Sequence, residues 1–516
     1  MNYENNKTNK SRFSFPLLKH KIALLSLIIM SLLPGQLISA QALKPIKSYS
    51  FSERIYSIQS DTTQHYLLVN TRSLTKSGKY LKNKGLMILF DLTTEKELWR
   101  KPFNYAIQTA FIYPDGVLVK NDFKSTTLYQ FADGKKLWNI DGTFTIYDNK
   151  TDKLFWYKYS AYKANDKHLN YRDFKTGKIL WTTTLPHKYG WKDFYIVNDS
   201  VRLIVSDDLH LINIHNGSGY HYTAETGEIR HSDRITNFFV TALSVGFLGI
   251  YAQPKVSYVK NTYSNIIYQD AHYYMADSKN LFCLNDTLGE VWKQTLPKKL
   301  ISSSHILSDS THIYMTNYGR ENTNDKEIGI PFIACYNRKD GHLIYLNQIK
   351  DKKAQIHNSF HKGNKEYILF DKEIVCRTLS TDSSEVKVMP WDAKKYGNLN
   401  SIVFNDVYFA NADSTIFRKM SSDYYRILLL TDTNTICEVN EEMQVVVAHP
   451  FSECFYPAAQ SKNEILLEGY GTLFLTNSLG MLQRKIKDVI YPLNTSGNHV
   501  YVISKEKDKV LDITLR

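Results

Sequence analysis

The sequence is poor in cysteine and lacks the short motifs that mark common catalytic sites. Five cysteines occur in 516 residues, and none belongs to a Cys-x-x-Cys or Cys-x-x-Cys-His motif. The signatures of thiolate zinc sites, dithiol redox centres and c-type haem attachment are therefore absent. A Gly-x-Ser-x-Gly nucleophile elbow, a His-Glu-x-x-His zinc helix and a phosphate-binding glycine loop are also missing. These absences disfavour the corresponding classes of enzyme.

Long apolar runs are scarce, and the one near the N-terminus is short. Residues 22–33 are apolar, whereas a helix needs about 20 residues to span a bilayer. Pro34 and Gly35 end the run, and small residues around Ala40 suit cleavage. Residues 1–40 are therefore predicted to be a secretory signal peptide, with an uncleaved anchor as the alternative. No cysteine follows the run, which disfavours a lipoprotein. The basic residues that precede it are Lys7, Lys10, Arg12, Lys19 and Lys21.

The chain has only a modest excess of basic residues. The formal net charge of +13 falls to +9 without residues 1–40. Basic clusters at 297–300 and 350–353 are expected in solvated loops, with anionic glycans or lipopolysaccharide as the alternative ligands. Because the protein is expected to be exported to the periplasm or the extracellular space, nucleic acid is not an expected partner. No Pro/Gly/Ser-rich linker divides residues 41–516, which predicts one domain.

An imperfect repeat runs through the chain, and its clearest copy is 169–181, Leu-Asn-Tyr-Arg-Asp-Phe-Lys-Thr-Gly-Lys-Ile-Leu-Trp. Alternating residues on both sides of Lys175-Thr-Gly177 are typical of two strands joined by a turn. The Asp173 carboxylate can accept hydrogen bonds from turn amides, and Gly177 can adopt a positive φ. Each copy therefore predicts one β-hairpin that ends on a large residue such as Trp181.

Other copies keep most of this pattern, although later ones replace the tryptophan by His231 or Tyr345. The clear copies are 91–99, 130–138, 173–181, 223–231, 285–292 and 337–345, and weaker echoes are 376–387, 437–445 and 473–484. The aromatic ends and turn glycines are predicted to anchor the repeat structurally. These anchors are Trp99, Trp138, Trp181, Trp292, Gly134, Gly177, Gly227, Gly289 and Gly341.

The spacing of the copies predicts an all-β fold, a β-propeller of four-stranded antiparallel blades. Successive copies end 39 to 61 residues apart, and four short strands with their turns need about 40 residues. The segments alternate and are rich in β-branched and aromatic residues, which disfavours helical repeats. The 385 residues from Trp99 to Arg484, divided by the mean step of about 49, predict eight blades, with seven as the alternative.

The pattern of an apolar strand, Asp, two residues, Thr-Gly-Lys, two residues and Trp resembles the repeat of PQQ-like (quinoprotein-type) β-propellers. This family includes pyrroloquinoline-quinone dehydrogenases. A dehydrogenase of the family would imply a vicinal Cys-Cys pair, calcium ligands and a docking tryptophan in nearly every blade. This chain has no Cys-Cys pair, and His231 and Tyr345 stand at two of the tryptophan positions. No quinone or other cofactor is therefore expected.

The cysteines are expected to be unpaired. Cys283, Cys335 and Cys376 share one repeat position, two residues before the turn opener, and Cys437 is a weaker candidate for it. Equivalent positions of different blades lie far apart, whereas a disulfide needs Cα atoms within about 7 Å. Buried free thiols are therefore predicted.

Three histidines close together in the sequence form a candidate metal site. His210, His215 and His221 lie near Asp207 and Asp208 in the sequence, and imidazole with carboxylate can bind a metal ion. His210 and His215 are an odd number of residues apart, so on one strand their rings would point to opposite faces. A solvated edge is favoured, and a metal site is the alternative.

The sequence therefore predicts an exported, monomeric, non-catalytic propeller that serves as a scaffold for a protein or glycan partner. The alternative is a degenerate quinoprotein-like dehydrogenase, or another enzyme, with its site at the propeller channel. No catalytic, cofactor-binding or metal-binding residue is assigned. Membrane association is expected only through an uncleaved signal segment.

Ring closure is expected to join the two ends of the domain. An open ring would leave unpaired strand edges that invite aggregation. A strand near residue 50 is therefore predicted to complete the blade formed by the C-terminal strands near residue 510.

Overall fold

The computed structural model describes most of the chain from residue 46 onward. The described residues are 46–61, 65–121, 124–157, 168–185, 193–205, 208–223, 229–230, 258–259, 264–277, 279–297, 304–319, 330–349, 356–383, 385–402, 427–440, 442–451, 456–460, 464–469, 471–477, 481–496 and 498–515. The predicted signal peptide, Asp207, Gly227, His231, Cys454 and the cluster at 350–353 lie outside these ranges, as does most of the cluster at 297–300. None of the helices within them is long and apolar enough to cross a membrane.

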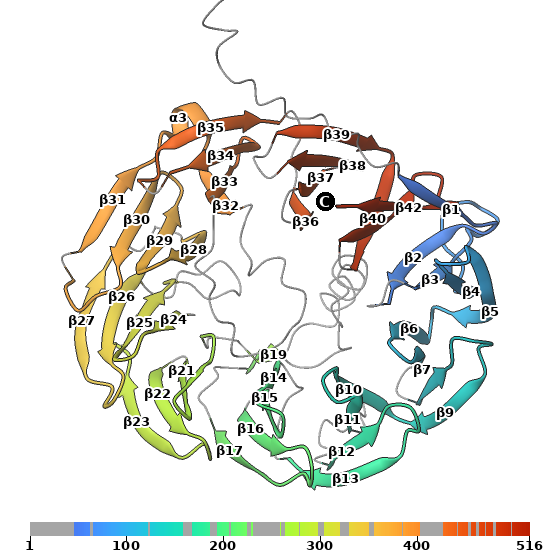
Figure 1. Cartoon of the computed structure of the whole chain (residues 1–516), viewed down its shortest axis with the longest axis horizontal. Coiled ribbons are helices and arrows are strands. Elements are labelled where there is room, and N and C mark those ends of the chain that lie inside the picture. Colours follow the sequence, from blue (N-terminus) through green and yellow to red (C-terminus); the bar gives the residue numbers. More distant parts are fainter. Residues whose placement is uncertain are drawn as a thin grey trace, which may run out of the picture. The chain divides into compact units, whose positions relative to one another are not determined.

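Ten four-stranded antiparallel sheets follow one another around a common axis as the blades of a β-propeller (Figure 1). We number the blades in the order in which the chain reaches their first, innermost strands. Blades 1 to 5 contain β2 (Ile55–Ser60), β3 (Tyr66–Thr71), β4 (Lys84–Asp91) and β5 (Lys96–Asn104); β6 (Gln108–Tyr113), β7 (Gly116–Asn121), β8 (Ser125–Tyr129) and β9 (Lys136–Asp141); β10 (Thr143–Asp148), β11 (Lys153–Tyr157), β12 (His168–Asp173) and β13 (Ile179–Thr184); β14 (Asp193–Ile196), β15 (Val201–Val205), β16 (Asp208–Asn213) and β17 (Gly219–Thr223); and β20 (Ile267–Gln269), β21 (His272–Ala276), β22 (Asn280–Asn285) and β23 (Glu290–Thr295).

Blades 6 to 10 continue the same order. They contain β24 (Ser304–Ser308), β25 (His312–Asn317), β26 (Phe332–Asn337) and β27 (Leu343–Gln348); β28 (Asn358–Lys362), β29 (Lys365–Phe370), β30 (Glu373–Thr378) and β31 (Val386–Pro390); β32 (Leu399–Ile402), β33 (Ile427–Thr431), β34 (Thr435–Val439) and β35 (Val445–Pro450); β36 (Tyr456–Gln460), β37 (Glu464–Gly469), β38 (Thr472–Asn477) and β39 (Leu482–Lys487); and β40 (Val489–Ser496), β41 (His499–Ser504), β42 (Lys509–Thr514) and β1 (Lys47–Ser50). A two-stranded pair, β18 (Ile229–Arg230) with β19 (Tyr258–Val259), and a one-turn helix, α3 (Ala393–Tyr396), lie between blades in the sequence.

The propeller fold is confirmed, but the predicted number of blades, eight or seven, is wrong because the structure has ten. The outermost strands of blades 1 to 9 run from the one with Trp99 to the one with Arg484. Nine blades enclose only eight intervals, so a count of intervals is one blade too low. The count of repeat copies also missed the tenth blade, because its outermost strand is β1, at the other end of the chain. A hairpin that is split between the two termini leaves no continuous copy in the sequence.

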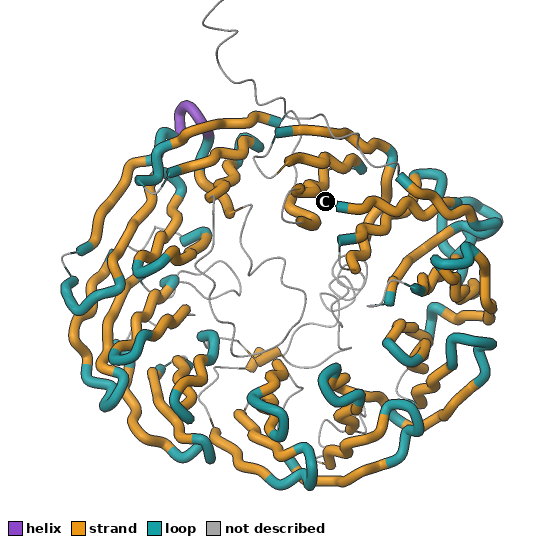
Figure 2. The backbone as a smooth tube through the Cα atoms, viewed as in Figure 1, coloured by secondary structure: helices purple, strands orange, loops and turns teal. Residues whose placement is uncertain are grey.

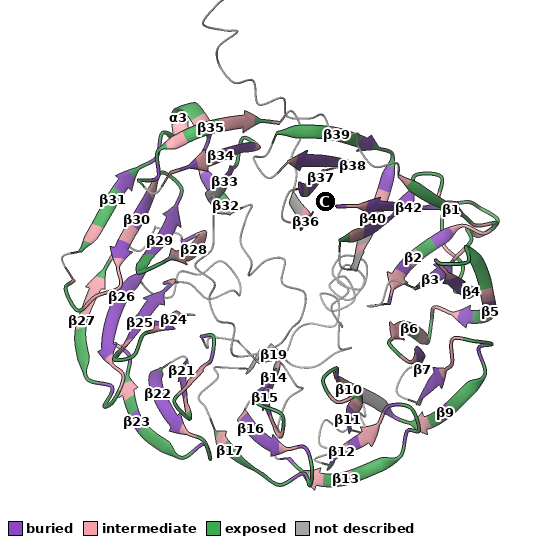
Figure 3. Ribbon diagram, in the orientation of Figure 1, coloured by how far each residue is buried: buried purple, intermediate pink, exposed green. Residues whose placement is uncertain are grey.

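The core lies between neighbouring blades, and burial follows the position of each strand (Figure 3). The second strand of blade 1 contains the fully buried Leu67, Leu68 and Val69, because both faces of that strand are covered by adjacent sheets. A strand covered on both faces is apolar throughout rather than alternating. The outermost strands β9 and β23 instead alternate, with one buried tryptophan among exposed neighbours.

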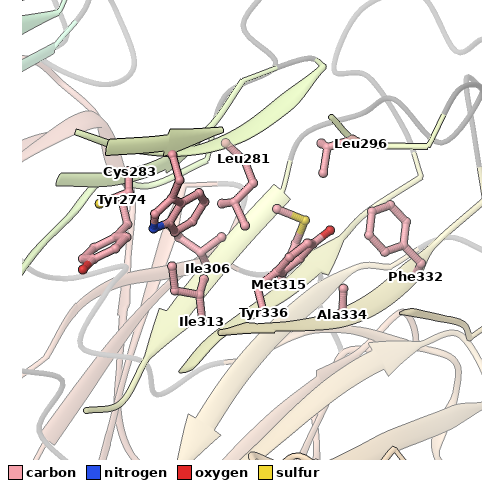
Figure 4. Packing of buried hydrophobic residues seen from close by; sticks show 12 residues of the cluster. Tyr274, Leu281, Cys283, Leu296, Ile306, Ile313, Met315, Phe332, Ala334 and Tyr336 are labelled. Atoms are coloured by element: carbon pink, nitrogen blue, oxygen red, sulfur yellow. The ribbon is translucent and has the colours of Figure 1, made fainter. Parts of the chain in front are cut away.

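Figure 4 shows one of these interfaces, between blades 5 and 6. Leu281 and Cys283 from β22 meet Ile306, Ile313 and Met315 from β24 and β25, and these side chains are fully buried. Burial of one large aliphatic side chain contributes about 1.5–3 kcal/mol. Interfaces of this kind, repeated around the ring, therefore supply most of the free energy of folding. A blade without a neighbour would lose this contribution.

The predicted closure of the ring is confirmed. β1 pairs antiparallel with β42, with Lys47 opposite Asp512 and Tyr49 opposite Val510. The amide oxygen of Asn494 on β40 accepts hydrogen bonds from the Ser60 backbone N–H at 2.7 Å and from its hydroxyl at 2.6 Å, which joins blade 10 to blade 1. The two ends of the chain therefore complete one sheet.

Turns and loops link the strands within each blade and link one blade to the next (Figure 2). The two faces of the ring differ in these connections. Because strands alternate in direction, connections from second to third strands and from blade to blade join strand ends on one face, here named the loop face. The other turns join strand ends on the opposite face, the turn face. The longest segments between strand ends on the loop face are 72–83, 158–167, 224–266, 318–331 and 349–357, and of these only 72–83 is described throughout. On the turn face every connection has at most seven residues except 403–426.

Candidate functional site

Each of the four predicted tryptophan anchors joins its blade to the next one along the chain. Trp138, on the outermost strand of blade 2, donates its indole N–H to the Phe174 carbonyl of blade 3 at 2.7 Å. Its ring lies against Gly177, where an added Cβ would come within 3.0 Å of the indole. Gly177 has φ +67°, as the turn pattern predicted. The repeat thus places a large ring in one blade against a bare backbone turn in the next.

The same arrangement recurs at three further junctions. The indole N–H of Trp99 donates to Phe131 at 2.8 Å, that of Trp181 to Ile214 at 2.6 Å, and that of Trp292 to Arg338 at 3.1 Å. The turn glycines that face these rings are Gly134, Gly217 and Gly341. Trp99, Trp138 and Trp292 are 8% exposed, whereas Trp181 is only half-buried.

The turns of blades 4 and 5 differ from the other copies. The turn of blade 4 is 214–218 and uses Gly217. The predicted copy at 223–231 lies mostly outside the described residues, and so does Gly227. In blade 5 the shorter turn puts the positive φ on Leu288, at +58°, instead of Gly289. The spacing from Asn213 to Gly217 matches that from Asp173 to Gly177, and this signal could have identified the correct copy.

Replacing Trp138 by Ala should reduce the free energy of unfolding by about 3 kcal/mol, because the buried ring and its hydrogen bond to blade 3 are both lost. Chemical denaturation followed by circular dichroism would measure the change. Leu137→Ala is the matched control, since Leu137 is 43% exposed and its loss should change stability by less than about 0.5 kcal/mol. Equal effects of the two variants would contradict the anchoring role.

Buried charges that the sequence did not single out also lie at blade junctions. Arg377 on β30 donates its Nε–H to Glu366 Oε2 on β29 at 2.6 Å, and both side chains are 1% exposed. Thr316, on β25 of blade 6, accepts from Arg377 Nη2 at 3.0 Å and donates to Glu366 at 2.9 Å. The carboxylate is therefore engaged in holding blades 6 and 7 together.

Two histidines flank this network. His305 on β24 and His361 on β28 belong to the innermost strands of the same two blades. Burial lowers the pKa of His305, and the Glu366 and Arg377 charges act on it in opposite directions. Burial also lowers the pKa of His361, and the proximity of His305 adds to this effect. Both imidazoles are thus favoured in the neutral form at neutral pH.

A second buried ion pair joins blades 3 and 4. Arg202 Nε donates to Asp148 Oδ2 at 2.8 Å, and neither side chain is exposed. The Tyr171 hydroxyl donates to the same oxygen at 3.3 Å, and Arg202 Nη1 donates to the Asn198 carbonyl at 2.6 Å. Arg202 and Glu366 occupy the strand position that is Leu67 in blade 1. A charge at an otherwise apolar repeat position was the available sequence signal.

The three histidines of the candidate metal site lie on the inner strand β16, in the turn that follows it and on the outermost strand β17. His210 is buried on β16, and His221 on β17 is exposed, with ring centroids 6.2 Å apart. His215 lies in the turn, with Nε2 3.2 Å from the Ser200 hydroxyl. Across the described ranges, no group of three or more His, Cys, Asp or Glu side chains could hold a metal ion.

The cysteines occupy equivalent strands, as the repeat predicted. Cys283, Cys335, Cys376 and Cys437 lie on the third strands of blades 5 to 8 and are free thiols. Burial raises the pKa of Cys283 to about 11 and that of Cys335 to about 12. These thiols are therefore protonated and unreactive at neutral pH.

Two other groups have a pKa near neutrality because they are buried, and they lie in different parts of the ring. Burial lowers the pKa of Lys120, on β7 of blade 2, to about 7. Burial raises the pKa of Glu468, on β37 of blade 9, to about 7. Blades 10 and 1 separate them, so they do not form an acid–base pair.

Replacing Glu468 by Gln should stabilise the protein at about pH 8 but not at about pH 4. The carboxyl keeps its proton up to about pH 7 in the folded state, whereas in the unfolded chain it loses the proton near pH 4.5. The wild-type protein therefore loses stability as the pH rises from about 4.5 to about 7. Gln carries no charge and avoids this loss, which is about 1 kcal/mol after allowance for partial exposure. Melting curves across pH would test this, with the exposed Glu442→Gln as control. A difference independent of pH would contradict it.

Comparisons with known proteins add little to this geometry. No family model matches the chain, and no curated protein matches it. A structure of BamB from Moraxella catarrhalis is 9% identical over 79% of this chain and 96% of its own, with a TM-score of 0.33. Apo AztD from Citrobacter koseri is 8% identical over 70% and 91%, with a TM-score of 0.31. A eukaryotic initiation factor is 10% identical over 78% and 96%, with a TM-score of 0.41. The assignment as a ten-bladed β-propeller rests on the strand pairing of the chain itself.

Proposed function

We infer that the chain is an exported, non-catalytic propeller that acts as a protein- or glycan-binding scaffold through its loop face. The observation that carries this proposal is that long segments between strands, such as 72–83 and 318–331, begin and end on that face. Long loops on a rigid frame are the usual carriers of binding function. The buried charged groups, in contrast, are engaged between blades, as Glu366 and Asp148 show.

Site-specific photo-crosslinking in the native host would test this proposal. A photoreactive residue at Tyr80 or Lys394 reports on the loop face, and one at Lys150 or Lys339 reports on the turn face. We expect discrete crosslinked species from the loop-face positions, and a panel of immobilised neutral and acidic glycans should be bound if the partner is a glycan. Crosslinks that arise only from the turn face would overturn the proposal.

The competing dehydrogenase hypothesis has its own measurement. Pyrroloquinoline quinone with calcium should raise the melting temperature of an enzyme that binds them, because a ligand that binds the folded state stabilises it. We expect no change for a binding scaffold. A concentration-dependent rise would favour the enzyme over the scaffold.

A further inference from the structure

A basic hairpin connects β3 to β4 on the loop face. We define it as residues 72–84, Arg-Ser-Leu-Thr-Lys-Ser-Gly-Lys-Tyr-Leu-Lys-Asn-Lys. An isolated bridge pairs Leu74 with Leu81, and the Thr75 N–H donates to the Tyr80 carbonyl at 2.7 Å. Gly78, with φ +70°, forms the tip. The segment is therefore an ordered hairpin rather than a long unpaired loop.

The base of the hairpin is held by an aromatic and cationic stack. The Arg72 guanidinium lies 5.2 Å from the Tyr56 ring centroid and 4.9 Å from that of Tyr105. It also donates to the Lys82 carbonyl and to Asn83 Oδ1. The Tyr105 hydroxyl donates to the Thr71 carbonyl at 3.1 Å. These contacts tie the hairpin to the first strand of blade 1 and to the connection that follows β5.

The hairpin carries an uncompensated positive charge. Residues 62–90 contain no Asp or Glu. Its lysines, Lys76, Lys79, Lys82 and Lys84, are all exposed and form no ion pair within the described part of the chain. Glu53, next to Arg54 at the base, already accepts a hydrogen bond from Arg100 Nη1 at 2.6 Å. The charge is thus directed to solvent and favours an anionic partner.

Apolar side chains surround the same charges. Tyr80 is 71% exposed, Ile107 is 43% exposed, and Leu74 and Tyr56 are each 38% exposed. Of the exposed large apolar residues in the described ranges, these four are the ones outside the outermost strands and the turn before β39. All four lie at the loop-face end of blade 1, on the hairpin or beside its base. Exposed apolar groups that gather in this way mark interaction surfaces.

We propose that the basic hairpin docks the loop face of the propeller on an anionic lipid surface. Most side chains of the hairpin are exposed, so it needs no enclosing partner and can contact a flat surface. Lysine ammonium groups are attracted to anionic headgroups within a Debye length, and tyrosine and leucine side chains partition into the interfacial region of a bilayer. The hairpin therefore combines electrostatic attraction with apolar partitioning. An acidic polymer would bind the lysines but leave Leu74 and Ile107 in water. This proposal is independent of the protein or glycan partner proposed above.

The test is flotation of the chain from residue 41, which contains the whole closed ring from β1 to β42, with vesicles of defined composition. The protein should float with vesicles of phosphatidylcholine and about one third phosphatidylglycerol, and not with phosphatidylcholine alone. Binding should weaken at high salt, since the attraction is electrostatic. Failure to float with the anionic vesicles would overturn the proposal, and so would equal binding to both.

Matched variants localise the effect. The double variant Lys76→Gln/Lys79→Gln should lower the partition coefficient by roughly 30-fold, because each basic residue near an anionic surface contributes independently. Tyr80→Ser should lower it at both low and high salt. Lys293→Gln/Lys387→Gln, on exposed positions of β23 and β31, is the control and should change nothing. Unchanged binding of the hairpin variants, or binding of polygalacturonate without vesicle binding, would overturn the assignment to lipid. All substituted side chains are exposed, so unchanged melting curves would show that the variants fold.

Discussion

A chain truncated after Lys505 should lose most of its stability as a whole, rather than fray at one edge. The truncation removes β42, which pairs with β1 on one side and β41 on the other. Val510, Ile513 and Leu515 are at most 3% exposed, and at about 1.5–3 kcal/mol for each side chain their loss costs about 4.5–9 kcal/mol. The stability of a typical folded domain is only about 5–15 kcal/mol.

The effect should spread because the closing blade covers its neighbour. Val510 and Tyr49 belong to one buried cluster with Ile55, Leu67 and Ile88 of blade 1. Calorimetry should show a broad transition at a much lower temperature for the truncated chain. Replacing residues 76–79 of the basic hairpin by a short turn is the control, since this change removes no strand and should leave the transition sharp. A truncated chain that melts as sharply and as high as the parent would refute the requirement for closure.

Removing the Glu366 carboxylate should have the second large effect. Glu366→Ala leaves the Arg377 guanidinium buried without its counter-charge, and breaking one side of a buried pair costs about 3–5 kcal/mol. Thr316 also loses the acceptor of its hydroxyl hydrogen bond. We therefore expect about 4 kcal/mol of destabilisation in urea unfolding, with weakened contact between blades 6 and 7.

A double substitution separates charge from packing. Glu366→Met/Arg377→Met replaces the pair by apolar side chains of similar size and should recover most of the lost stability. An exposed pair provides the control: Lys505 and Asp488 are 2.9 Å apart with side chains 68% and 61% exposed. Lys505→Gln should change stability by less than about 1 kcal/mol. If the double Met variant were no more stable than Glu366→Ala, the uncompensated charge would not be the cause.

The turn chemistry of the repeat was predictable because it is local. In the copy at 173–181, Asp173 Oδ1 accepts a hydrogen bond from the Thr176 N–H at 2.8 Å, and Gly177 takes the positive φ. Both requirements are set by residues within five positions of each other, so they are visible in the sequence. The docking of Trp99, Trp138 and Trp292 at equivalent positions of blades 1, 2 and 5 followed from the same spacing. In blade 4 the repeat copy was assigned to the wrong residues, because a second Gly-containing segment follows Gly217 closely and has a similar pattern.

The proposed docking surface and the buried ion pairs were less predictable, because they depend on which segments meet in the fold. The lysines at 76–84 are visible in the sequence. However, the linear order does not show that Tyr56 and Ile107 lie beside them, so it does not predict a docking surface. The Glu366–Arg377 pair is similar, because its partner Thr316 lies 50 residues from Glu366 on another blade. Contacts between blades are made through space, and repeats that have diverged conceal which positions face one another.

The sequence by itself determined the all-β repeat, the four-stranded blade and the joining of the chain ends, because these follow from strand alternation, turn residues and the need to pair exposed edges. Only the tertiary structure decided the number of blades. Closure depends on the angle at which each sheet packs on the next, which is set by side chains such as those of Leu281 and Met315 across an interface. The tertiary structure also decided which charges are buried, and that the long connections and the basic hairpin share one face of the ring.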